Sequence, residues 1–159
     1  MRVLIVSDTH GKHKGIEQAI AMERPLDLLI HLGDGLGYEG YFAELAGCPV
    51  EIVAGNSDFF SPLPREKVLN LRGRNIFLTH GHMYYVDYDI DRLVQAAHAR
   101  GCTVAMYGHT HRPLIEIGRK MTVLNPGSLT HPRQPGKKPS YIVMDLREGK
   151  KPVYTLKYL

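Results

Sequence analysis

Near its start the chain contains the segment Val3-Leu4-Ile5-Val6-Ser7-Asp8-Thr9-His10, in which four aliphatic residues precede four polar ones. An uninterrupted aliphatic run of this length is typical of a strand whose two faces are both buried. Such strands belong to sheets that helices cover, and ligands bind where the strands end. The segment therefore predicts an α/β fold with polar side chains at the carboxyl edge of a sheet.

The elements that follow continue this alternation of strand and helix. Aliphatic runs predict two further strands, and apolar stripes at helical spacing predict two helices. In chain order these elements are a helix at about 13–24, a strand at 26–31, a helix at 38–45 and a strand at 49–54. Two β-α-β units in succession predict a parallel sheet with helices on its faces.

The second half of the chain changes character after one more such unit. A strand at 75–79, a helix at 90–97 and a strand at 103–107 follow one another. Four short strands without intervening helices come next, at 114–117, 121–124, 141–145 and 153–158. These predict antiparallel hairpins on a second sheet or at a sheet edge. Because no repeat or linker interrupts the chain, we expect residues 1–159 to form one domain.

The composition argues against several classes of protein. Lys and Arg number 20 against 16 Asp and Glu, which gives a net charge of only +4. The basic residues are scattered along the sequence apart from Arg133, Lys137 and Lys138, so we expect no specific nucleic-acid binding. No apolar run is long enough for a signal peptide or a membrane span, and we expect a cytoplasmic protein without membrane association.

Polar side chains follow five of the expected strands at the point where each one ends. The segments are Ser7-Asp8-Thr9-His10, Gly33-Asp34, Gly55-Asn56-Ser57-Asp58, His80-Gly81-His82 and Gly108-His109-Thr110-His111. Ligands bind outside the carboxyl ends of strands in open α/β sheets, so we expect these side chains to converge. Alternate residues of an extended chain point the same way, so an Asp-x-His and a His-x-His pair can each reach one site.

Each of these residues alone has a more ordinary interpretation. A single Asp after a strand is usually a turn former, and we retain a surface or core position for His13 and His98 on helix faces. His31, inside a strand, is expected in the core or behind the ligands. The ordinary interpretation fails for the whole set, because crowded ionisable groups are costly to desolvate without a metal. The set comprises Asp8, His10, Asp34, Asn56, His80, His109 and His111.

In this order the set resembles the pattern of the calcineurin-like metallophosphoesterases: D-x-H, then G-D, G-N, H and G-H-x-H. The resemblance runs from Val3 to about Arg133 and is greatest to the small bacterial and archaeal phosphodiesterases, which also share the segment Asn125-Pro126-Gly127-Ser128. It implies an α/β fold in which a two-sheet β-sandwich is flanked by helices (α/β/β/α). It further implies a metal-dependent enzyme that hydrolyses a small-molecule phosphodiester.

The resemblance also assigns two divalent metal ions to the set. The first ion's ligands would be Asp8, His10 and His111, the second ion's would be Asn56, His80 and His109, and Asp34 would bridge the two. Carboxylate and imidazole together suit Mn, Fe, Zn, Ni or Co, and we expect Mn. Two such ions can share one water and lower its pKa, so that a bridging hydroxide attacks phosphorus in line.

The chain departs from the family pattern at one position. Many relatives have a His after the Gly-Asn pair that protonates the leaving group or binds phosphate, whereas this chain has Ser57, as the small phosphodiesterases commonly do. The candidate catalytic residues are then His82, as proton donor or structural residue, and Asp58, as orienting or turn-capping residue. Asn56 and Arg133 are the candidates for contact with the substrate.

Other functions are compatible with the same fold. The retromer scaffold subunit has this fold with a degraded metal site and works by protein binding, whereas the present chain keeps the full ligand set. A phosphomonoesterase or nucleotide hydrolase would use the same ligands, and the sequence does not exclude either. Aromatic residues such as Phe59, Phe60, Tyr84 and Tyr85 fit the interface of a homo-oligomer, a dimer or tetramer, and fit a substrate wall or a core position equally well.

Overall fold

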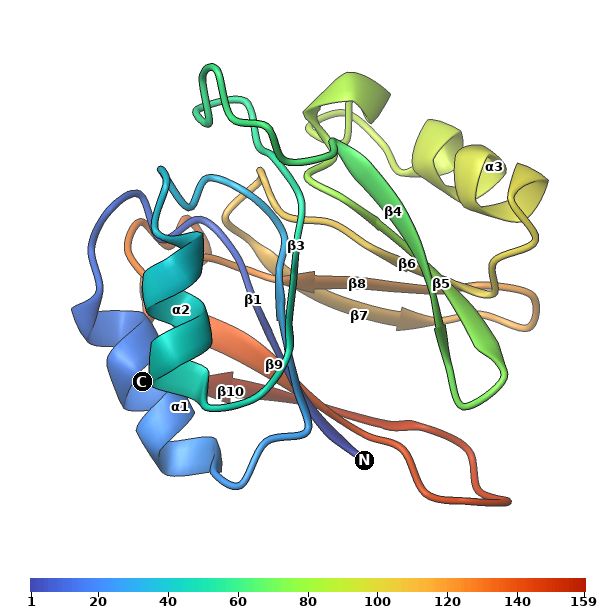
Figure 1. Cartoon of the computed structure of the whole chain (residues 1–159). Coiled ribbons are helices and arrows are strands. Elements are labelled where there is room, and N and C mark those ends of the chain that lie inside the picture. The colour runs from blue at the N-terminus through green and yellow to red at the C-terminus, as the bar shows by residue number, and fades with distance from the viewer.

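Two five-stranded β-sheets pack face to face in the computed structural model, which describes residues 1–159 (Figure 1). The elements are β1 (Arg2–Val6), α1 (Lys14–Glu23), β2 (Leu28–His31), α2 (Glu39–Ala46), β3 (Val50–Ile52), β4 (Glu66–Leu71), β5 (Arg74–Thr79), the 3₁₀ helix η1 (His82–Tyr84), α3 (Asp91–Ala99), β6 (Val104–Met106), β7 (Pro113–Ile117), β8 (Thr122–Pro126), β9 (Ser140–Asp145) and β10 (Val153–Tyr158). The strand orders are β10-β9-β1-β2-β3 and β4-β5-β6-β8-β7.

The alternation of side chains along β1 explains why its whole aliphatic run is buried. Val3 and Ile5 pack in the core between the two sheets, whereas Leu4 and Val6 pack in the core beneath α1 and α2. The second sheet follows the same rule, since Phe77 of β5 packs beneath α3 and its neighbours face the first sheet. The protein thus has four layers, α/β/β/α, as the family resemblance implied.

Both sheets are mixed. In the first sheet β1, β2 and β3 are parallel, and β9 joins β1 antiparallel with β10 outside it. In the second sheet β5, β6 and β8 are parallel, with β4 and β7 as antiparallel edge strands. The expected hairpins are therefore divided between the sheets: β9 and β10 extend the first sheet, and β7 pairs with β8 in the second.

One strand was absent from our sequence-based expectations. β4 lies at an edge, and only Leu69 and Leu71 pack on the core between the sheets, while Val68 is 48% exposed. A strand with so few buried residues shows only a weak alternation of apolar and polar residues in the sequence. In β4 the alternation is weaker still because the strand begins with the charged Glu66 and Lys67. The other expected strands are present, and none of their bounds differs by more than two residues.

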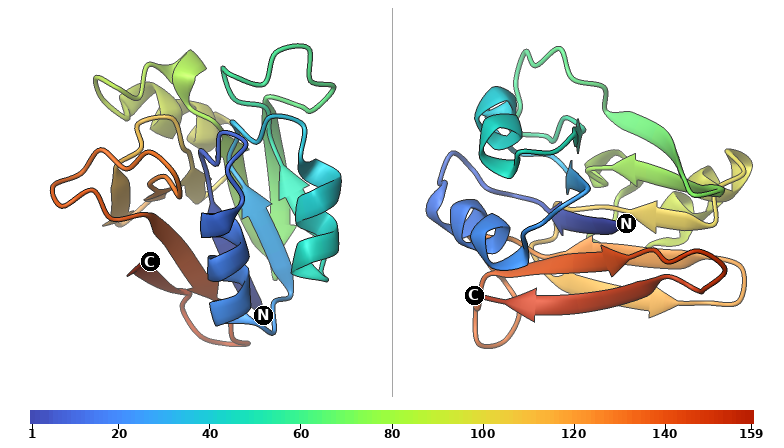
Figure 2. Two further views of the ribbon diagram at one scale, coloured as in Figure 1. Left: turned by 90° about the vertical axis from the view of Figure 1, so that its left-hand side faces the viewer. Right: turned by 60° about the horizontal axis from the view of Figure 1, so that its bottom comes forward.

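The helices lie on the outer faces of the sandwich. α1 and α2 lie side by side on the first sheet, and α3 covers the second (Figure 2). Gly47 caps α2 with φ 64°, a left-handed conformation that glycine adopts without steric cost. None of the helices has the length and apolar character needed to cross a membrane.

Candidate metal centre

The loops that follow β1, β2, β3, β5 and β6 meet at one end of the sandwich (Figure 2). These loops carry all seven members of the predicted ligand set, so both sheets contribute to one cluster of side chains. The cluster lies at the carboxyl ends of parallel strands, which is where the topology of such sheets creates a binding crevice.

One group of ligand atoms comes from the loops after β1 and β6. Nε2 of His111 lies 3.1 Å from Oδ1 of Asp8 and 3.3 Å from Nε2 of His10. Nε2 of His10 is 3.8 Å from the same oxygen of Asp8. The three donor atoms all lie within 4.8 Å of one another, a separation that a single metal ion can bridge.

A second group of ligand atoms lies on the other side of the crevice. Oδ1 of Asn56 is 3.0 Å from Nε2 of His80 and 2.9 Å from Nδ1 of His109. An amide oxygen and two imidazole nitrogens from the loops after β3, β5 and β6 therefore converge. Imidazole and oxygen donors are a ligand mixture that suits Mn, Fe, Zn, Co or Ni.

Asp34 stands between the two groups. Its Oδ2 is 3.7 Å from Nε2 of His10 and 3.6 Å from Nε2 of His80, almost the same distance. The backbone N–H and hydroxyl of Ser57 donate to the two carboxylate oxygens at 2.8 and 2.9 Å and fix their direction. This central position is the one that a bridging carboxylate requires.

Backbone strain is concentrated in the same residues. Of the ten non-glycine residues with positive φ, five belong to the ligand set: Asp8, His10, Asp34, His109 and His111. Left-handed conformations cost of order 1 kcal/mol or more for non-glycine residues and cluster at functional sites. The fold thus holds these five side chains in directions that a relaxed strand end would not give them.

Two glycines allow the close approach of the loops. A Cβ atom on Gly55 would lie 2.0 Å from Oδ1 of Asp34. One on Gly108 would lie 2.0 Å from Oγ of Ser7 and 2.9 Å from Oδ2 of Asp8. Any side chain at either position would displace a carboxylate of the centre, which explains the Gly-Asn and Gly-His pairs in the sequence.

Backbone carbonyl groups orient the imidazole rings of His80 and His111 through hydrogen bonds to Nδ1. Nδ1 of His80 donates to the carbonyl of Leu32 at 2.6 Å, and Nδ1 of His111 donates to the carbonyl of His131 at 2.8 Å. Each bond places the proton on Nδ1 and leaves the lone pair of Nε2 facing the crevice. Both rings are therefore prepared to act as metal ligands through Nε2.

His109 has the opposite orientation. Its Nε2 donates to Oδ2 of Asp87 at 2.8 Å, so Nδ1 is the nitrogen that faces Asn56. The sequence pattern predicts no role for Asp87 or His131. Neither residue follows a predicted strand in a recognisable pattern, and only the packing of the loops brings them to the ligands.

The environment of the buried oxygen Oδ1 of Asp8 indicates whether the centre suits a cation. Asp8 is fully buried, and this oxygen has no hydrogen-bond partner of adequate geometry, although Nε2 of His111 is near. Burial alone would raise the pKa of Asp8, but the side-chain contact with His111 and the charge that His80 carries when it is protonated outweigh burial and lower the pKa. A buried carboxylate oxygen surrounded by imidazole lone pairs fits a divalent metal ion.

Asp58 supports the centre without reaching into it. Its carboxylate accepts hydrogen bonds from the backbone N–H groups of Asp34, Leu36 and Gly55 at 2.7, 2.7 and 2.8 Å. These bonds tie the loop after β2 to the loop after β3. These contacts are compatible with both roles that the sequence allowed for Asp58, since the bond from Gly55 caps its own turn and the bonds from Asp34 and Leu36 hold the neighbouring loop.

His82 lies beside the centre, in η1. Its ring centroid is 5.5 Å from that of His80 and 6.0 Å from that of His109. Nη1 of Arg65 donates to its Nε2 at 3.3 Å, so the proton lies on Nδ1, which is buried without a partner. Burial, with the neighbouring His80, lowers the pKa of His82 to about 4.

Arg133 lies at the rim of an open hollow beside the first group of ligands. The hollow has a volume of about 610 Å³ and includes His10 and His111 together with His131 and Lys137. The backbone N–H of Arg133 donates to the carbonyl of His111 at 3.0 Å, while its side chain is exposed. The structure thus gives this hollow a basic rim next to the centre.

The chain is similar in sequence to one known family and to several named relatives. The sequence pattern of the calcineurin-like phosphoesterase superfamily domain matches residues 1–149. The chain belongs to the calcineurin-like phosphoesterase superfamily. The probable metallophosphoesterase YsnB of Bacillus subtilis is 36% identical to this phosphoesterase over 135 residues, which is 84% of this chain and 78% of YsnB. The phosphodiesterase YfcE of Escherichia coli is 30% identical over 170 aligned residues, which is 91% of this chain and 88% of YfcE.

Solved structures place this phosphoesterase in the same fold. A predicted phosphoesterase from Streptococcus pneumoniae has a TM-score of 0.82 at 26% identity and covers 99% of this chain and 88% of its own. Vps29 from Entamoeba histolytica, solved with zinc, has a TM-score of 0.78 at 19% identity and covers 99% of both chains, which shows likeness of fold alone. The family resemblance and the α/β/β/α fold are confirmed, and the protein is a metal-dependent phosphoesterase.

Proposed function

We propose that this phosphoesterase is a dinuclear phosphodiesterase. The observation that carries the proposal is the position of Asp34, whose Oδ2 is nearly equidistant from His10 and His80, one from each group of ligand atoms. A carboxylate between two sets of nitrogen donors is the arrangement that a bridged pair of divalent ions requires. The phosphodiesterase name of the relative YfcE supports the substrate class.

The seven ligands divide as the family resemblance implies. Asp8, His10 and His111 would hold one ion, Asn56, His80 and His109 would hold the other, and Asp34 would serve both. When bound, such ions supply an activated water for in-line attack and neutralise the non-bridging oxygens of the phosphoryl group. We propose Mn²⁺ as the activating ion, with Fe, Zn, Ni and Co as the alternatives that the same donors suit.

The residues around the ligands position the ligand side chains or bind the substrate. Ser57 directs the carboxylate of Asp34, and Asp87 directs the ring of His109. Arg133 on the rim of the hollow offers a cation to the part of the substrate that extends beyond the centre. His82, whose ring centroid is 5.5 Å from that of His80, stays the candidate for the protonation of the leaving group. Because its pKa is lowered to about 4, it would carry the imidazolium proton only in acid.

Ser57 is the reason to propose a diester as substrate. A phosphate monoester brings a dianion to the centre and needs an extra cationic donor, such as an imidazole at this position. Ser57 is a neutral side chain, and its hydroxyl is already engaged by Asp34. A diester carries a single negative charge and needs no such partner.

The test compares two chromogenic esters. With Mn²⁺ added, bis(p-nitrophenyl) phosphate should have a kcat/KM at least about tenfold above that of p-nitrophenyl phosphate. A clear preference for the monoester would overturn the choice of substrate class but leave the metal centre standing. Failure to hydrolyse either ester with any of the five metals would instead favour the alternative of a non-catalytic scaffold with this fold.

A further inference from the structure

A strongly basic surface lies at the end of the sandwich opposite the candidate metal centre. The turns that join β4 to β5, β7 to β8 and β9 to β10 form it (Figure 1). Its seven cationic side chains, here called the basic pole, are Arg72, Arg74, Arg119, Lys120, Arg147, Lys150 and Lys151. Arg74 begins β5 and His80 follows its end, so the pole lies roughly 20 Å from the centre, given the rise of a strand.

The basic pole concentrates the charge of the whole molecule. It holds seven of the 20 Lys and Arg residues and, with Glu148, only one of the 16 Asp and Glu residues. The rest of the chain has 13 Lys and Arg residues and 15 Asp and Glu residues, which gives it a formal charge of −2. The net charge of +4 is therefore a local property of this end, which the scattered positions in the sequence conceal.

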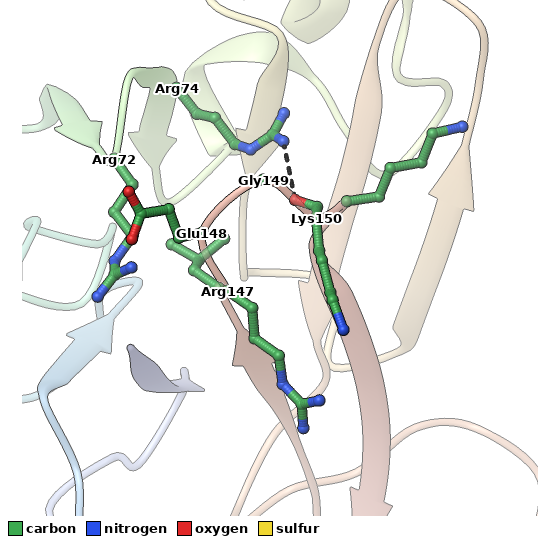
Figure 3. Close-up of a pocket in the computed structure, with 8 residues that line it drawn as sticks. Arg72, Arg74, Arg147, Glu148, Gly149 and Lys150 are labelled. Carbon is green, nitrogen blue, oxygen red and sulfur yellow. Dashed lines mark hydrogen bonds between the residues drawn. The ribbon is translucent and has the colours of Figure 1, made fainter.

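The pole is hollowed. A cavity of about 640 Å³ is lined by eight residues, of which five are cationic and only Leu146 is hydrophobic. Figure 3 shows Arg147 and Lys150 extending in the same direction from the β9–β10 connection, with the guanidinium of Arg74 above them. A second hollow of about 410 Å³ shares Arg74 and Lys151 with the first.

The cations of the pole have no anionic partners. None of the seven forms a salt bridge, whereas Arg2, Lys67, Arg100 and Lys157 elsewhere in the protein each pair with a carboxylate. Within the pole, the guanidinium of Arg74 donates to the carbonyl of Lys150 at 3.5 Å, which links the turns of the two sheets. Glu148 is the one carboxylate among these seven cations, so like charges predominate and repel one another, and an anion in the cavity would relieve the repulsion.

We propose that the basic pole binds a compact oligophosphate anion, such as inorganic tripolyphosphate, at a site separate from the metal centre. Arg72, Arg74 and Arg147 supply guanidinium groups, which bind phosphate oxygens in pairs of hydrogen bonds. The volume of the cavity falls within the range of about 300–1,000 Å³ for small-ligand sites. No aromatic side chain lines it, so a nucleobase would find nothing to stack on.

The experiment is a calorimetric titration of the full-length protein with tripolyphosphate, with no metal added. One-to-one binding is expected, with a dissociation constant in the micromolar range at low salt that weakens as salt rises. The double variant Arg72→Gln/Arg147→Gln should bind at least about tenfold more weakly, since it removes two of the phosphate donors. Both side chains are exposed and free of ion pairs, so folding and diester hydrolysis should be unchanged.

The matched control is a double variant that loses two positive charges outside the basic pole. Lys14→Gln/Arg92→Gln replaces two exposed cations on α1 and α3 and should bind tripolyphosphate as the wild type does. The phosphate tail of a nucleotide is the other source of this chemistry, and ATP should bind no more tightly than tripolyphosphate. Absence of binding, equal loss in both double variants, or tighter binding of a single-stranded RNA than of tripolyphosphate would each overturn the proposal.

Discussion

At the scale of single residues, the centre depends on a few carboxylates that the backbone holds in strained positions. Asp8 and Asp34 both have positive φ and are almost completely buried. Two buried carboxylates so close together repel each other, and the surrounding imidazoles alone do not satisfy them, as the unpartnered Oδ1 of Asp8 shows. The local conformation is therefore explained by a cation better than by packing.

Asp34→Asn should weaken metal binding and abolish turnover. The amide keeps the shape of the side chain but removes the negative charge that two cations would share, and we expect Mn²⁺ affinity and kcat each to fall at least about 100-fold. Calorimetry with Mn²⁺ and hydrolysis of a chromogenic diester measure the two effects. Glu44→Gln, a charge loss on an exposed part of α2, is the matched control, and near-normal activity of Asp34→Asn would refute the bridging role.

Asp58→Ala should destabilise the protein by about 3 kcal/mol, because it leaves three backbone N–H groups without their acceptor. The loop that carries Asp34 then loses its anchor, so Mn²⁺ affinity should fall about 10- to 100-fold. Urea denaturation and metal titration give the two numbers. Asp58→Asn keeps one acceptor oxygen and should recover part of both, whereas unchanged metal affinity in Asp58→Ala would remove its positioning role.

At the scale of the elements, one buried carboxylate adds polar contacts to the apolar packing of α1 on the first sheet. Glu23 at the end of α1 is 2% exposed, binds Arg2 of β1 in a salt bridge, and accepts from Tyr141 of β9 at 2.9 Å and Lys157 of β10 at 2.7 Å. Burial would raise the pKa of Glu23, but the hydrogen bonds from Lys157, Arg2 and Tyr141 outweigh it, and the pKa is lowered. This polar junction joins three strands to the helix.

The junction predicts a pH dependence of stability. Because the pKa of Glu23 is lower in the folded protein than its ordinary value of 4.5, its contribution is present above pH 4.5 and is lost as the pH falls through the lowered value. Glu23→Gln should therefore cost about 2 kcal/mol at pH 7 and progressively less below pH 4.5. Urea denaturation of both proteins across this range measures the difference, and a cost that did not shrink in acid would show that the charge plays no part.

At the scale of the whole molecule, the centre joins the two sheets. Asp8, His10, Asp34 and Asn56 come from the first sheet, and the other ligands come from the second. Ions bound there would connect both halves of the sandwich, and they would bind the folded state much more tightly than the unfolded chain.

Mn²⁺ should therefore raise the midpoint of thermal unfolding. At a free concentration of 100 times the dissociation constant, one site contributes about 2.7 kcal/mol, which corresponds to a rise of several degrees for a chain of this size. Differential scanning calorimetry with chelator and with Mn²⁺ measures the shift. Asp34→Asn should show a much smaller shift, and a wild-type protein indifferent to Mn²⁺ would argue against a centre that spans the sheets.

The sequence predicts the ligand residues well, but it does not predict the residues that surround them. The burial of β1 on both faces and the polar residues at the strand ends were predictable, because both depend on periodicity and order along the chain. The orienting contacts of Asp87 and His131 were not, since they join residues far apart in sequence through loop packing. For the same reason, the scattered positions of most basic residues in the sequence gave no sign of the basic pole.

What the sequence by itself determined is the ordered series of ligand-type residues, the alternation of strands and helices, and through them the family. Only the tertiary structure decided how the strands divide between two sheets, which nitrogen of each imidazole faces the crevice, and where the positive charge gathers. The physical reason is that a local pattern encodes which side of an element is buried, whereas the partner that covers it is chosen by packing of the whole chain.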